Sequence, residues 1–353
     1  MSEVLEIRAG RKALERIREC GLNPDSVDVM VGASGGPKWF VLTGLDKALM
    51  GEFFKDRQRP LHLLGTSAGS WRFCCYAQND ALAAHERFEQ GYLMTSYSAR
   101  PDAAEISREA RQLVKDILGT NGAREIIENP VMRFNLIAVR SHGLGRSERK
   151  GPLMAGMSLA AASNMISRKS LNAFFTRTLF HPPGEKAPFY AISDLRTQRV
   201  ELSEDNLAKA VLASGSIPIV MEGVRNIPDA PAGIYRDGGV TDYHFDIKFA
   251  EEDQLVLYPH FYRHMIPGWF DKGLKWRRPS PENCDNVVLV SPSADFVSRL
   301  PHGKIPDRND FKNLPRDERI KYWRVVIRES ERLGEAFLEL TGSGRIRQTI
   351  RPL

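Results

Sequence analysis

Short apolar runs alternate with helix-like stretches along most of this 353-residue sequence, and that alternation limits the folds it can adopt. Residues 26–31, 61–64 and 133–139 have the composition of buried strands, whereas residues 37–53 and 80–129 have helix-like periodicity. Strands that alternate with helices pack as a largely parallel sheet between helical layers. The sequence therefore predicts the α/β class, with a three-layer α/β/α architecture and a mostly parallel central sheet.

The rest of the chain continues this pattern without an obvious linker. We expect further strands at residues 188–193, 200–202, 255–258 and 287–290, and further helices at residues 11–20, 205–213 and 315–340. The polar segments 140–150 and 301–315 have the composition of surface loops. We therefore expect an N-terminal helical segment (residues 1–26), a core (residues 27–250) and a C-terminal helical extension (residues 251–353) packed on the same domain.

Charge and cysteine content bear on the partners and the compartment. The net charge of +6 favours an anionic partner, whether nucleic acid, acidic substrate or lipid surface, although 50 basic against 44 acidic residues is a thin excess. Residues 1–20 lack the apolar stretch of a signal peptide, and residues 151–167 are too short and polar to span a bilayer. The cysteines have neither metal-ligand nor disulfide spacing, which indicates reduced thiols at Cys20, Cys74, Cys75 and Cys284. We expect a cytoplasmic protein, peripheral to membranes at most, with no metal or cofactor.

The strongest single motif is Gly65-Thr66-Ser67-Ala68-Gly69, between a predicted strand and a predicted helix. This G-x-S-x-G pattern is typical of a tight turn that exposes a nucleophilic serine, and Gly65 and Gly69 let the backbone fold back closely around Ser67. The helix N-terminus that follows favours developing negative charge. A glycine-rich turn with a capping serine has the same composition, so the motif needs support from elsewhere in the chain.

A second glycine turn, Ser34-Gly35-Gly36-Pro37-Lys38, lies about one strand–helix–strand unit upstream. Acyl transfer needs hydrogen-bond donors where an oxyanion develops, and the backbone amides of a glycine loop at a helix start supply them. Pro37 has no amide hydrogen, so Gly35 and Gly36 are the expected donors, and Lys38 adds positive charge. The alternative is a nucleotide phosphate loop, but the segment matches neither G-x-x-x-x-G-K-[ST] nor G-x-G-x-x-G.

The third motif is Tyr235-Arg236-Asp237-Gly238-Gly239. An activated serine needs a proton acceptor, and a carboxylate within hydrogen-bond reach can serve directly. Gly238 and Gly239 let the backbone turn so that Asp237 can face the serine. Asp-Gly-Gly alone is a commonplace turn. Its significance lies in the order of the three motifs, which is glycine loop, serine elbow and then aspartate.

In this order the motifs resemble those of the patatin-like phospholipases. A fourth block, residues 213–218 (A-S-G-S-I-P), is similar to the small-residue and proline segment that precedes the aspartate in that family. The resemblance covers residues 27–245. It implies a patatin-like α/β/α fold for this part of the chain. It also implies a lipid acyl-ester hydrolase that works through an acyl-enzyme intermediate and needs neither a catalytic histidine nor calcium.

The resemblance further implies roles for individual residues. Ser67 takes the place of the nucleophile and Asp237 that of its base, while Gly35, Gly36 and Lys38 take the place of the oxyanion hole. The chain also departs from the family pattern. The family's loop usually opens with Asp-Gly where this chain has Ala-Ser, and a further glycine is common where this chain has tryptophan. A hole of different shape is expected to change the substrate more than the chemistry.

Two other hypotheses remain open at the level of sequence. A Ser–His–Asp triad on an α/β-hydrolase fold would place its histidine after the acid. The candidates are His244, His260, His264 and His302. A protein with the same fold and no catalytic activity would be a binding protein. The acyl chain, the headgroup and the oligomeric state are not specified by any motif, so phospholipid, acylglycerol and soluble ester all remain candidate substrates.

Residues 261–278 mix aromatic with basic side chains (F-Y-R-H-M-I-P-G-W-F-D-K-G-L-K-W-R-R). Such a segment can lie at an anionic membrane surface, with rings at headgroup level and cations at phosphates. The alternative is a packed connection whose aromatic side chains are core and whose cations are solvated. Binding to single-stranded nucleic acid is disfavoured because no nucleic-acid-binding fold is recognisable.

Overall fold

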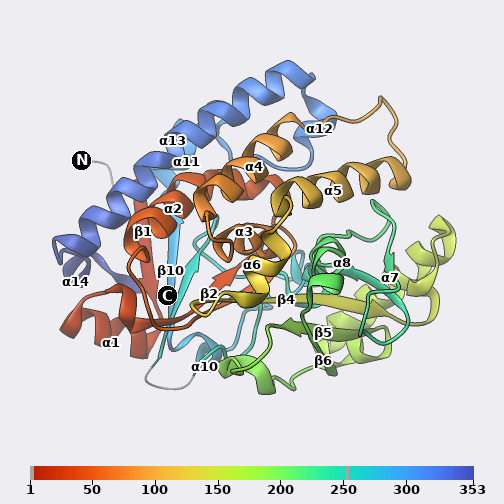
Figure 1. Cartoon of the computed structure of the whole chain (residues 1–353), viewed down its shortest axis with the longest axis horizontal. Coiled ribbons are helices and arrows are strands. Elements are labelled where there is room, and N and C mark those ends of the chain that lie inside the picture. The colour runs from red at the N-terminus through yellow and green to blue at the C-terminus, as the bar shows by residue number, and fades with distance from the viewer. Residues whose placement is uncertain (1–3, 251–253) are drawn as a thin grey trace.

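An eleven-stranded mixed sheet forms the centre of the computed structural model, which describes residues 4–250 and 254–353. Its main path has the order β11-β1-β10-β9-β2-β3-β4-β5-β6, and β7 and β8 lie off this path, with β8 paired to β4 and to β7. Figure 1 labels β1, β10, β2, β4, β5 and β6 of this sheet. The strands are β1 (Leu5–Ala9), β2 (Val27–Gly32), β3 (Leu61–Thr66), β4 (Met132–Ser141), β5 (Phe175–His181), β6 (Thr197–Glu201), β7 (Val224–Arg225), β8 (Ile234–Asp237), β9 (Leu255–Pro259), β10 (Val287–Pro292) and β11 (Arg351–Pro352).

The strands at the middle of the sheet, β9, β2, β3 and β4, are parallel, so their carboxyl ends meet at one edge. β3 is buried along its whole length and β2 along nearly all of it, which explains their near-continuous apolar runs. Antiparallel pairs join β1 to β10 and β4 to both β5 and β8. The strands expected at 26–31, 61–64, 133–139, 255–258 and 287–290 are confirmed, with boundary shifts of a few residues.

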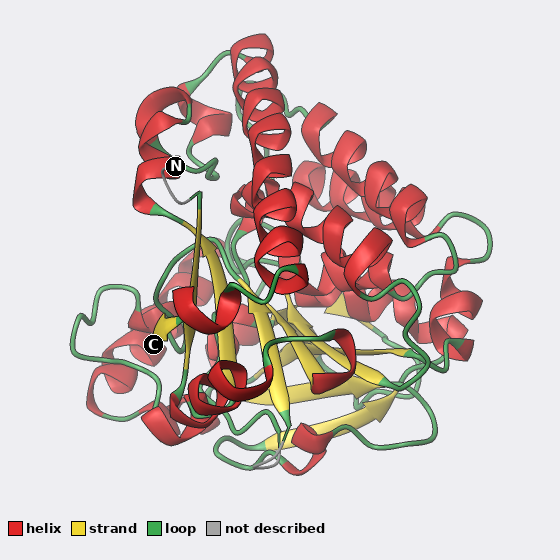
Figure 2. Cartoon of the chain, turned by 90° about the vertical axis from the view of Figure 1, so that its left-hand side faces the viewer, coloured by secondary structure: helices red, strands yellow, loops and turns green. Residues whose placement is uncertain are grey.

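Helices cover both faces of this sheet, which confirms the three-layer architecture. Figure 2 shows long helices stacked over one face, with shorter helices and loops beneath the other. The helices are α1 (Arg11–Cys20), α2 (Thr43–Ala48), α3 (Ala68–Tyr76), α4 (Ala81–Met94), α5 (Ala103–Leu118), α6 (Gly122–Glu128), α7 (Lys150–Ile166), α8 (Glu204–Ser214), α9 (Gly239–Asp242), α10 (Pro281–Cys284), α11 (Ala294–Arg299), α12 (Asp310–Asn313), α13 (Arg316–Gly342) and α14 (Ile346–Thr349). The helices expected at 11–20, 205–213 and 315–340 correspond to α1, α8 and α13.

The expectation of a strand at residues 188–193 is wrong, and one strand of the sheet was not predicted. Residues 188–193 are not a strand, because Pro188–Ala191 forms a 3₁₀ turn that starts at the proline, where its fixed φ is favourable. The strand beside β4 is instead β5, which was not predicted from the sequence. Arg177 interrupts its apolar character, yet this residue is buried because it pairs with Asp194 and Asp242.

Both ends of the chain contribute to the same sheet. β1 pairs with β10, and β9, from the last hundred residues, pairs with β2 at the centre. α13 packs across α2 on one face. All four cysteines lie among the described residues as free thiols. Within the described part of the chain, no helix combines the length and the apolar character needed to cross a bilayer.

Candidate active site

Ser67 lies in a sharp turn between β3 and α3. Its backbone has φ of 51° and ψ of −126°, a strained conformation for a residue with a side chain that costs roughly 1–3 kcal/mol. The turn requires glycine on both sides. A Cβ on Gly65 would lie 2.5 Å from the backbone nitrogen of Ser70, and one on Gly69 would lie 2.1 Å from the carbonyl oxygen of Gly32. The elbow predicted from the G-x-S-x-G pattern is therefore the observed local structure.

The side chains of Ser67 and Asp237 are in direct contact although 170 positions separate them. Ser67 Oγ donates a hydrogen bond to Asp237 Oδ2 at 2.8 Å, and the backbone N–H of Gly239 donates to Asp237 Oδ1 at 2.7 Å. Ser67 is 6% exposed and Asp237 is 7% exposed. Desolvation raises the pKa of Asp237 to about 6, and the two hydrogen bonds act in the opposite direction. The pair has the geometry of a nucleophile and its base.

β8 carries Asp237 to this position by pairing antiparallel with β4, opposite Ala138. The chain then turns at two glycines where side chains cannot be accommodated. A Cβ on Gly238 would lie 2.1 Å from the carbonyl oxygen of Ile137, and one on Gly239 would lie 2.3 Å from Ser34 Oγ. The second of these contacts brings the Asp-Gly-Gly turn against the upstream glycine loop.

The segment at residues 213–218 holds the serine elbow and the aspartate strand together. The N–H of Ser67 donates to Ser214 Oγ at 3.0 Å, and the N–H of Gly238 donates to the carbonyl oxygen of Ser214 at 3.2 Å. The N–H of Asp237 donates to the carbonyl oxygen of Ser216 at 2.9 Å. The sequence pointed to this segment only by its likeness to the family, and these contacts show that it bridges the serine elbow and the aspartate strand.

The glycine loop, Ser67 and Asp237 line one small pocket of about 50 Å³. Gly36 has φ of +54°, which favours glycine, and a Cβ on Gly35 would lie 2.5 Å from the ring of Phe261. Neither amide has a hydrogen-bond partner among the described residues, as expected for groups that precede and begin the helical turn Gly36–Leu42. Both amides remain able to donate to a bound group.

Three cations border this pocket, and only Lys38 was predicted from the sequence. Lys272 Nζ lies 3.7 Å from the centre of the Tyr243 ring, and Arg308 lines the pocket from the C-terminal region. Desolvation of its ammonium group, together with repulsion from Arg308 and Lys38, lowers the pKa of Lys272 to about 7, although the residue as a whole is exposed. Burial likewise lowers the pKa of Lys38. The mixed basic and aromatic composition of residues 261–278 was a signal for Lys272, but no local pattern pointed to Arg308.

A larger groove of about 820 Å³ begins at Ser67 and shares Gly36, Trp269 and Arg308 with the smaller pocket. Its apolar walls come mainly from α3, α4, α5 and the segment after α8, and they include Trp71, Tyr92, Ile106, Leu113, Val220 and Phe311. Ser67 Oγ therefore lies where a small polar pocket meets a larger, mostly apolar groove.

The histidines do not join this arrangement. His244 is buried, and its Nδ1 accepts a hydrogen bond from the N–H of Ile266 at 3.0 Å. Burial and the neighbouring His260 lower the pKa of His244 far below its usual range, which keeps the ring neutral. His264 and His302 are exposed. Among the described residues, no histidine is hydrogen-bonded to Ser67 or Asp237, and no group of acidic, histidine and cysteine side chains is arranged to hold a metal.

Comparisons with known proteins identify the family of this chain. A family model described as patatin-like phospholipase matches residues 30–244. A solved structure of VipD from Legionella pneumophila is 17% identical, with a TM-score of 0.33, over 74% of this chain and 54% of VipD. Human GIVD cytosolic phospholipase A2 is 11% identical, with a TM-score of 0.38, over 96% of this chain and 62% of that chain. This chain thus spans less than two thirds of either structure.

A search of curated proteins gives no significant match. The family model nevertheless covers more than half of the sequence, including the glycine loop, the serine elbow and the aspartate turn. The protein belongs to the patatin-like phospholipase family.

Proposed function

We propose that this protein is a lipid acyl-ester hydrolase in which Ser67 attacks the ester carbonyl and Asp237 accepts its proton. The observation that carries the proposal is the 2.8 Å hydrogen bond from Ser67 Oγ to Asp237 Oδ2 inside a pocket of a patatin-family chain. A carboxylate with a pKa of about 6 is a stronger base than a solvated one and is still mostly ionised at neutral pH.

In the first half-reaction, Ser67 Oγ bonds to the carbonyl carbon while its proton passes to Asp237. The carbonyl electron pair moves onto the oxygen, where the amides of Gly35 and Gly36 donate hydrogen bonds and Lys38 adds positive potential. The bond between the carbonyl carbon and the alcohol oxygen then breaks. The departing alcohol takes the proton from Asp237, and the acyl group remains on Ser67.

In the second half-reaction, water takes the place of the alcohol. Asp237 accepts a proton as the water oxygen attacks the acyl carbon, and the same amides hold the second oxyanion. When the bond to Ser67 Oγ breaks, the proton on Asp237 returns to that oxygen and the fatty acid leaves. One carboxylate thus serves as base and then as acid in each half-reaction.

Two features support a lipid as the substrate. The apolar groove of about 820 Å³ that starts at Ser67 is suited to an acyl chain. Lys38, Lys272 and Arg308 around the smaller pocket favour an ester that carries an anionic group such as a phosphate close to the scissile bond. These features favour phospholipid over acylglycerol or soluble ester.

The Ser–His–Asp alternative is disfavoured by the contacts of His244. Its Nδ1 accepts from the backbone of Ile266, and its low pKa makes it a poor proton acceptor. The alternative of a binding protein without activity is disfavoured by the strained backbone at Ser67. Such strain is maintained where a turn presents a reacting group.

A serine-reactive fluorophosphonate probe tests the proposal. We expect the wild-type protein to be labelled and Ser67→Ala to stay unlabelled. Hydrolysis of a phospholipid with a short acyl chain should fall about 10²–10⁴-fold in Asp237→Asn. His244→Asn, which keeps an acceptor for the Ile266 amide, should retain activity within a few-fold of wild type.

The outcomes separate the three hypotheses. Wild-type protein that is neither labelled nor active would favour the binding protein. A loss of activity in His244→Asn as large as that in Asp237→Asn, with both variants folded by circular dichroism, would favour the triad. A panel of phospholipid, acylglycerol and soluble esters then identifies the substrate class.

A further inference from the structure

α7 is a 17-residue helix that is apolar on its exposed face as well as on its buried face. Gly151 to Ser167 contains no charged residue. The buried face packs against the sheet through Leu153, Met157 and Ala160. The opposite face of the helix is exposed, and its large side chains are Met154, Leu159, Met165 and Ile166. Ile166, at the end of the helix, is 89% exposed. A helix that is apolar all round is normally covered on every side.

Two neighbouring segments extend this exposed apolar face. Leu144 lies beside α7, since a Cβ on Gly156 would be 3.0 Å from the Cβ of Leu144. Trp276 is 68% exposed, and the next residue, Arg277, donates to the carbonyl oxygen of Asn164 at 2.9 Å near the end of α7. We call the exposed face of α7, together with Leu144 and Trp276, the α7 surface.

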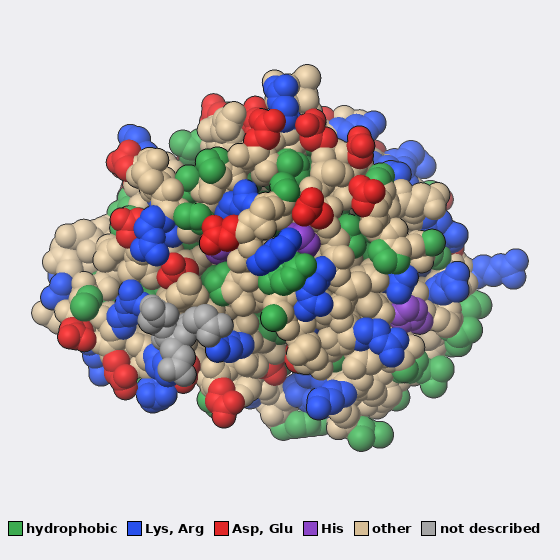
Figure 3. Space-filling model, turned by 60° about the horizontal axis from the view of Figure 1, so that its bottom comes forward, with side chains coloured by type: hydrophobic (Ala, Val, Ile, Leu, Met, Phe, Trp, Pro, Cys, Tyr) green, Lys and Arg blue, Asp and Glu red, His purple; other side chains and the backbone are tan. Residues whose placement is uncertain are grey.

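Exposed cations flank, in the sequence, the segments that form the α7 surface. Residues 149–184 contain no acidic residue, and Asp271 is the only acidic residue from 254 to 280. Asp271 is buried and paired with Arg168, so it does not offset the positive charge at the surface. The exposed cations in these segments are Arg149, Lys150, Lys169, Arg263, Lys272, Lys275 and Arg278. Figure 3 shows hydrophobic side chains along the right-hand edge, with Lys and Arg beside them, on the side where α7 lies in Figure 1.

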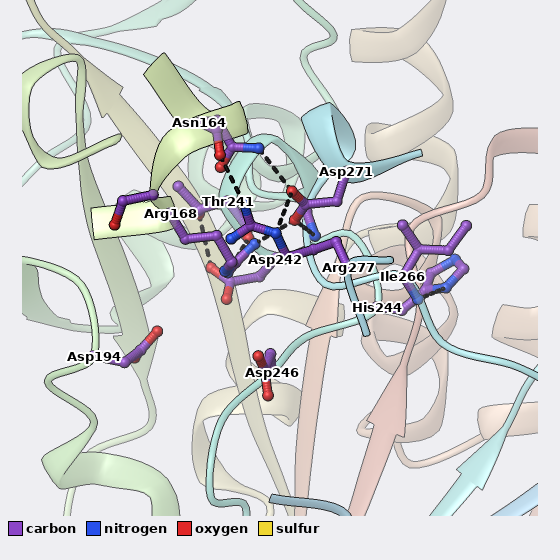
Figure 4. A network of polar contacts seen from close by, with 12 residues as sticks. Asn164, Arg168, Asp194, Thr241, Asp242, His244, Asp246, Ile266, Asp271 and Arg277 are labelled. Carbon is purple, nitrogen blue, oxygen red and sulfur yellow. Dashed lines mark hydrogen bonds and ion pairs between the residues drawn. The ribbon is translucent and has the colours of Figure 1, made fainter. Parts of the chain in front are cut away.

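The α7 surface is tied directly to the wall of the candidate active site. Asp271 accepts hydrogen bonds from Asn164 Nδ2 at 2.7 Å and from Arg168 at 2.8 Å (Figure 4). Trp269 and Lys272, which lie on either side of Asp271 in the sequence, line the pocket that contains Ser67. The same short segment therefore forms part of the pocket wall and anchors α7.

We infer that the α7 surface is the membrane-docking face of this protein and that it binds a bilayer containing anionic lipid. The apolar side chains enter the boundary between headgroups and acyl chains, with Trp276 at headgroup level, and the surrounding cations contact lipid phosphates. The inference rests on the proposed lipid substrate. It adds the surface through which the enzyme meets that lipid and orients its pocket.

The charge pattern favours a lipid surface over a protein partner or a second copy of the chain. A second copy would bring the same cations against one another, because a symmetric dimer places the same patch on both sides. An anionic bilayer instead satisfies both the apolar face and the cations at its rim. Continuity with the pocket wall places the docked membrane next to the groove that accepts an acyl chain.

Vesicle sedimentation with the 353-residue chain tests the inference. Wild type should bind vesicles of equal parts phosphatidylcholine and phosphatidylserine, and bind phosphatidylcholine alone much more weakly. Leu159→Glu/Ile166→Glu should weaken binding to the mixed vesicles at least about tenfold, because two carboxylates would take the place of aliphatic side chains that enter the anionic bilayer. Lys169→Gln and Lys275→Gln should each weaken it about fivefold, and only on the anionic vesicles.

Leu82→Glu/Met94→Glu is the matched control. It places the same charges at two large side chains that are 45% and 42% exposed on α4, and it should bind vesicles as wild type does. Ser67→Ala should also bind normally, because docking does not need the nucleophile. Both double variants should hydrolyse a soluble short-chain ester at the wild-type rate, whereas only Leu159→Glu/Ile166→Glu should lose activity on vesicles.

These readouts separate docking from catalysis. Vesicle binding that Leu159→Glu/Ile166→Glu leaves unchanged would overturn the inference even if the esterase activity is present. A wild-type dimer in sedimentation velocity that the same variant abolishes, with no vesicle binding, would assign the surface to self-association instead. Binding that depends on the α7 surface in a protein with no hydrolytic activity would sustain the docking face and reject the proposed function.

Discussion

At the scale of residues, the properties of Asp237 follow from where it is buried. A solvated aspartate has a pKa near ~3.9 and is a weak base at neutral pH. Burial raises the pKa of Asp237 to about 6, while the hydrogen bonds from Gly239 and Ser67 limit the rise. The carboxylate is thereby a better proton acceptor and is still ionised at pH 7. The serine hydroxyl it accepts from is fixed by the strained elbow.

The pH dependence of hydrolysis follows from that pKa. Only the ionised form of Asp237 can accept the serine proton, so kcat/KM for a neutral soluble ester should rise with pH and reach half its plateau near pH 6. At pH 4 the rate should be about a hundredfold lower than the plateau. Initial rates between pH 4 and 8, with Asp237→Asn as the control that lacks this limb, measure the effect. A flat profile above pH 5 would contradict the assignment.

At the scale of elements, α2 and α13 pack through glycines. A Cβ on Gly44 would lie 2.3 Å from the carbonyl oxygen of Ser330, and one on Gly334 would lie 2.5 Å from the carbonyl oxygen of Gly44. The N–H of Gly44 also donates to Ser330 Oγ at 2.9 Å. The two backbones therefore approach more closely than side chains would allow. α2 continues from the helical turn Gly36–Leu42 that begins in the glycine loop, so this contact also supports the site.

Gly334→Val should destabilise the protein by about 1–3 kcal/mol, because the new side chain forces the two helices apart. Gly342→Val, near the end of the same helix, is the control, since a Cβ there meets no atom within 4 Å. Urea unfolding followed by circular dichroism measures the difference in the free energy of unfolding. Equal stability of the two variants would show that α2 and α13 are not in close contact.

At the scale of the whole molecule, the sheet joins segments from both ends of the chain. β9 and β10, from the C-terminal region, continue the sheet from the central strand β2, and β1 adds the next strand. α13 covers the helix that follows the glycine loop. We propose that residues 1–26, 27–250 and 251–353 are parts of one cooperative unit, although the motifs of the site lie mainly in the second.

A chain that ends at residue 250 should therefore not fold on its own. It would leave β2 with an unpaired edge at the centre of the sheet and expose the apolar face of α2. We expect no cooperative urea transition and little near-ultraviolet circular dichroism. A chain that ends at residue 342 loses only α14 and the two-residue β11, so it should keep a cooperative transition. Cooperative unfolding of the shorter chain would show that the core is autonomous.

Local patterns in the sequence were sufficient for most of the central sheet and for the motifs of the site. An apolar run, a glycine turn and a helical period depend on neighbours in sequence, so β2, β3 and the elbow at Ser67 could be predicted. The order of the motifs, read through the family resemblance, also predicted that Ser67 and Asp237 would meet. The structure joins them with a hydrogen bond.

Only the tertiary structure decided the features that depend on residues distant in sequence. Arg177 is a charged residue that would be expected at the surface, but its two carboxylate partners allow it to be buried in β5. Lys272 and Arg308 reach the pocket from beyond the family's motifs. The apolar sequence of α7 predicts that the helix is buried on all sides, yet one of its faces is exposed. Burial, desolvation and charge pairing are set by which segments pack together, and no local pattern carries that information.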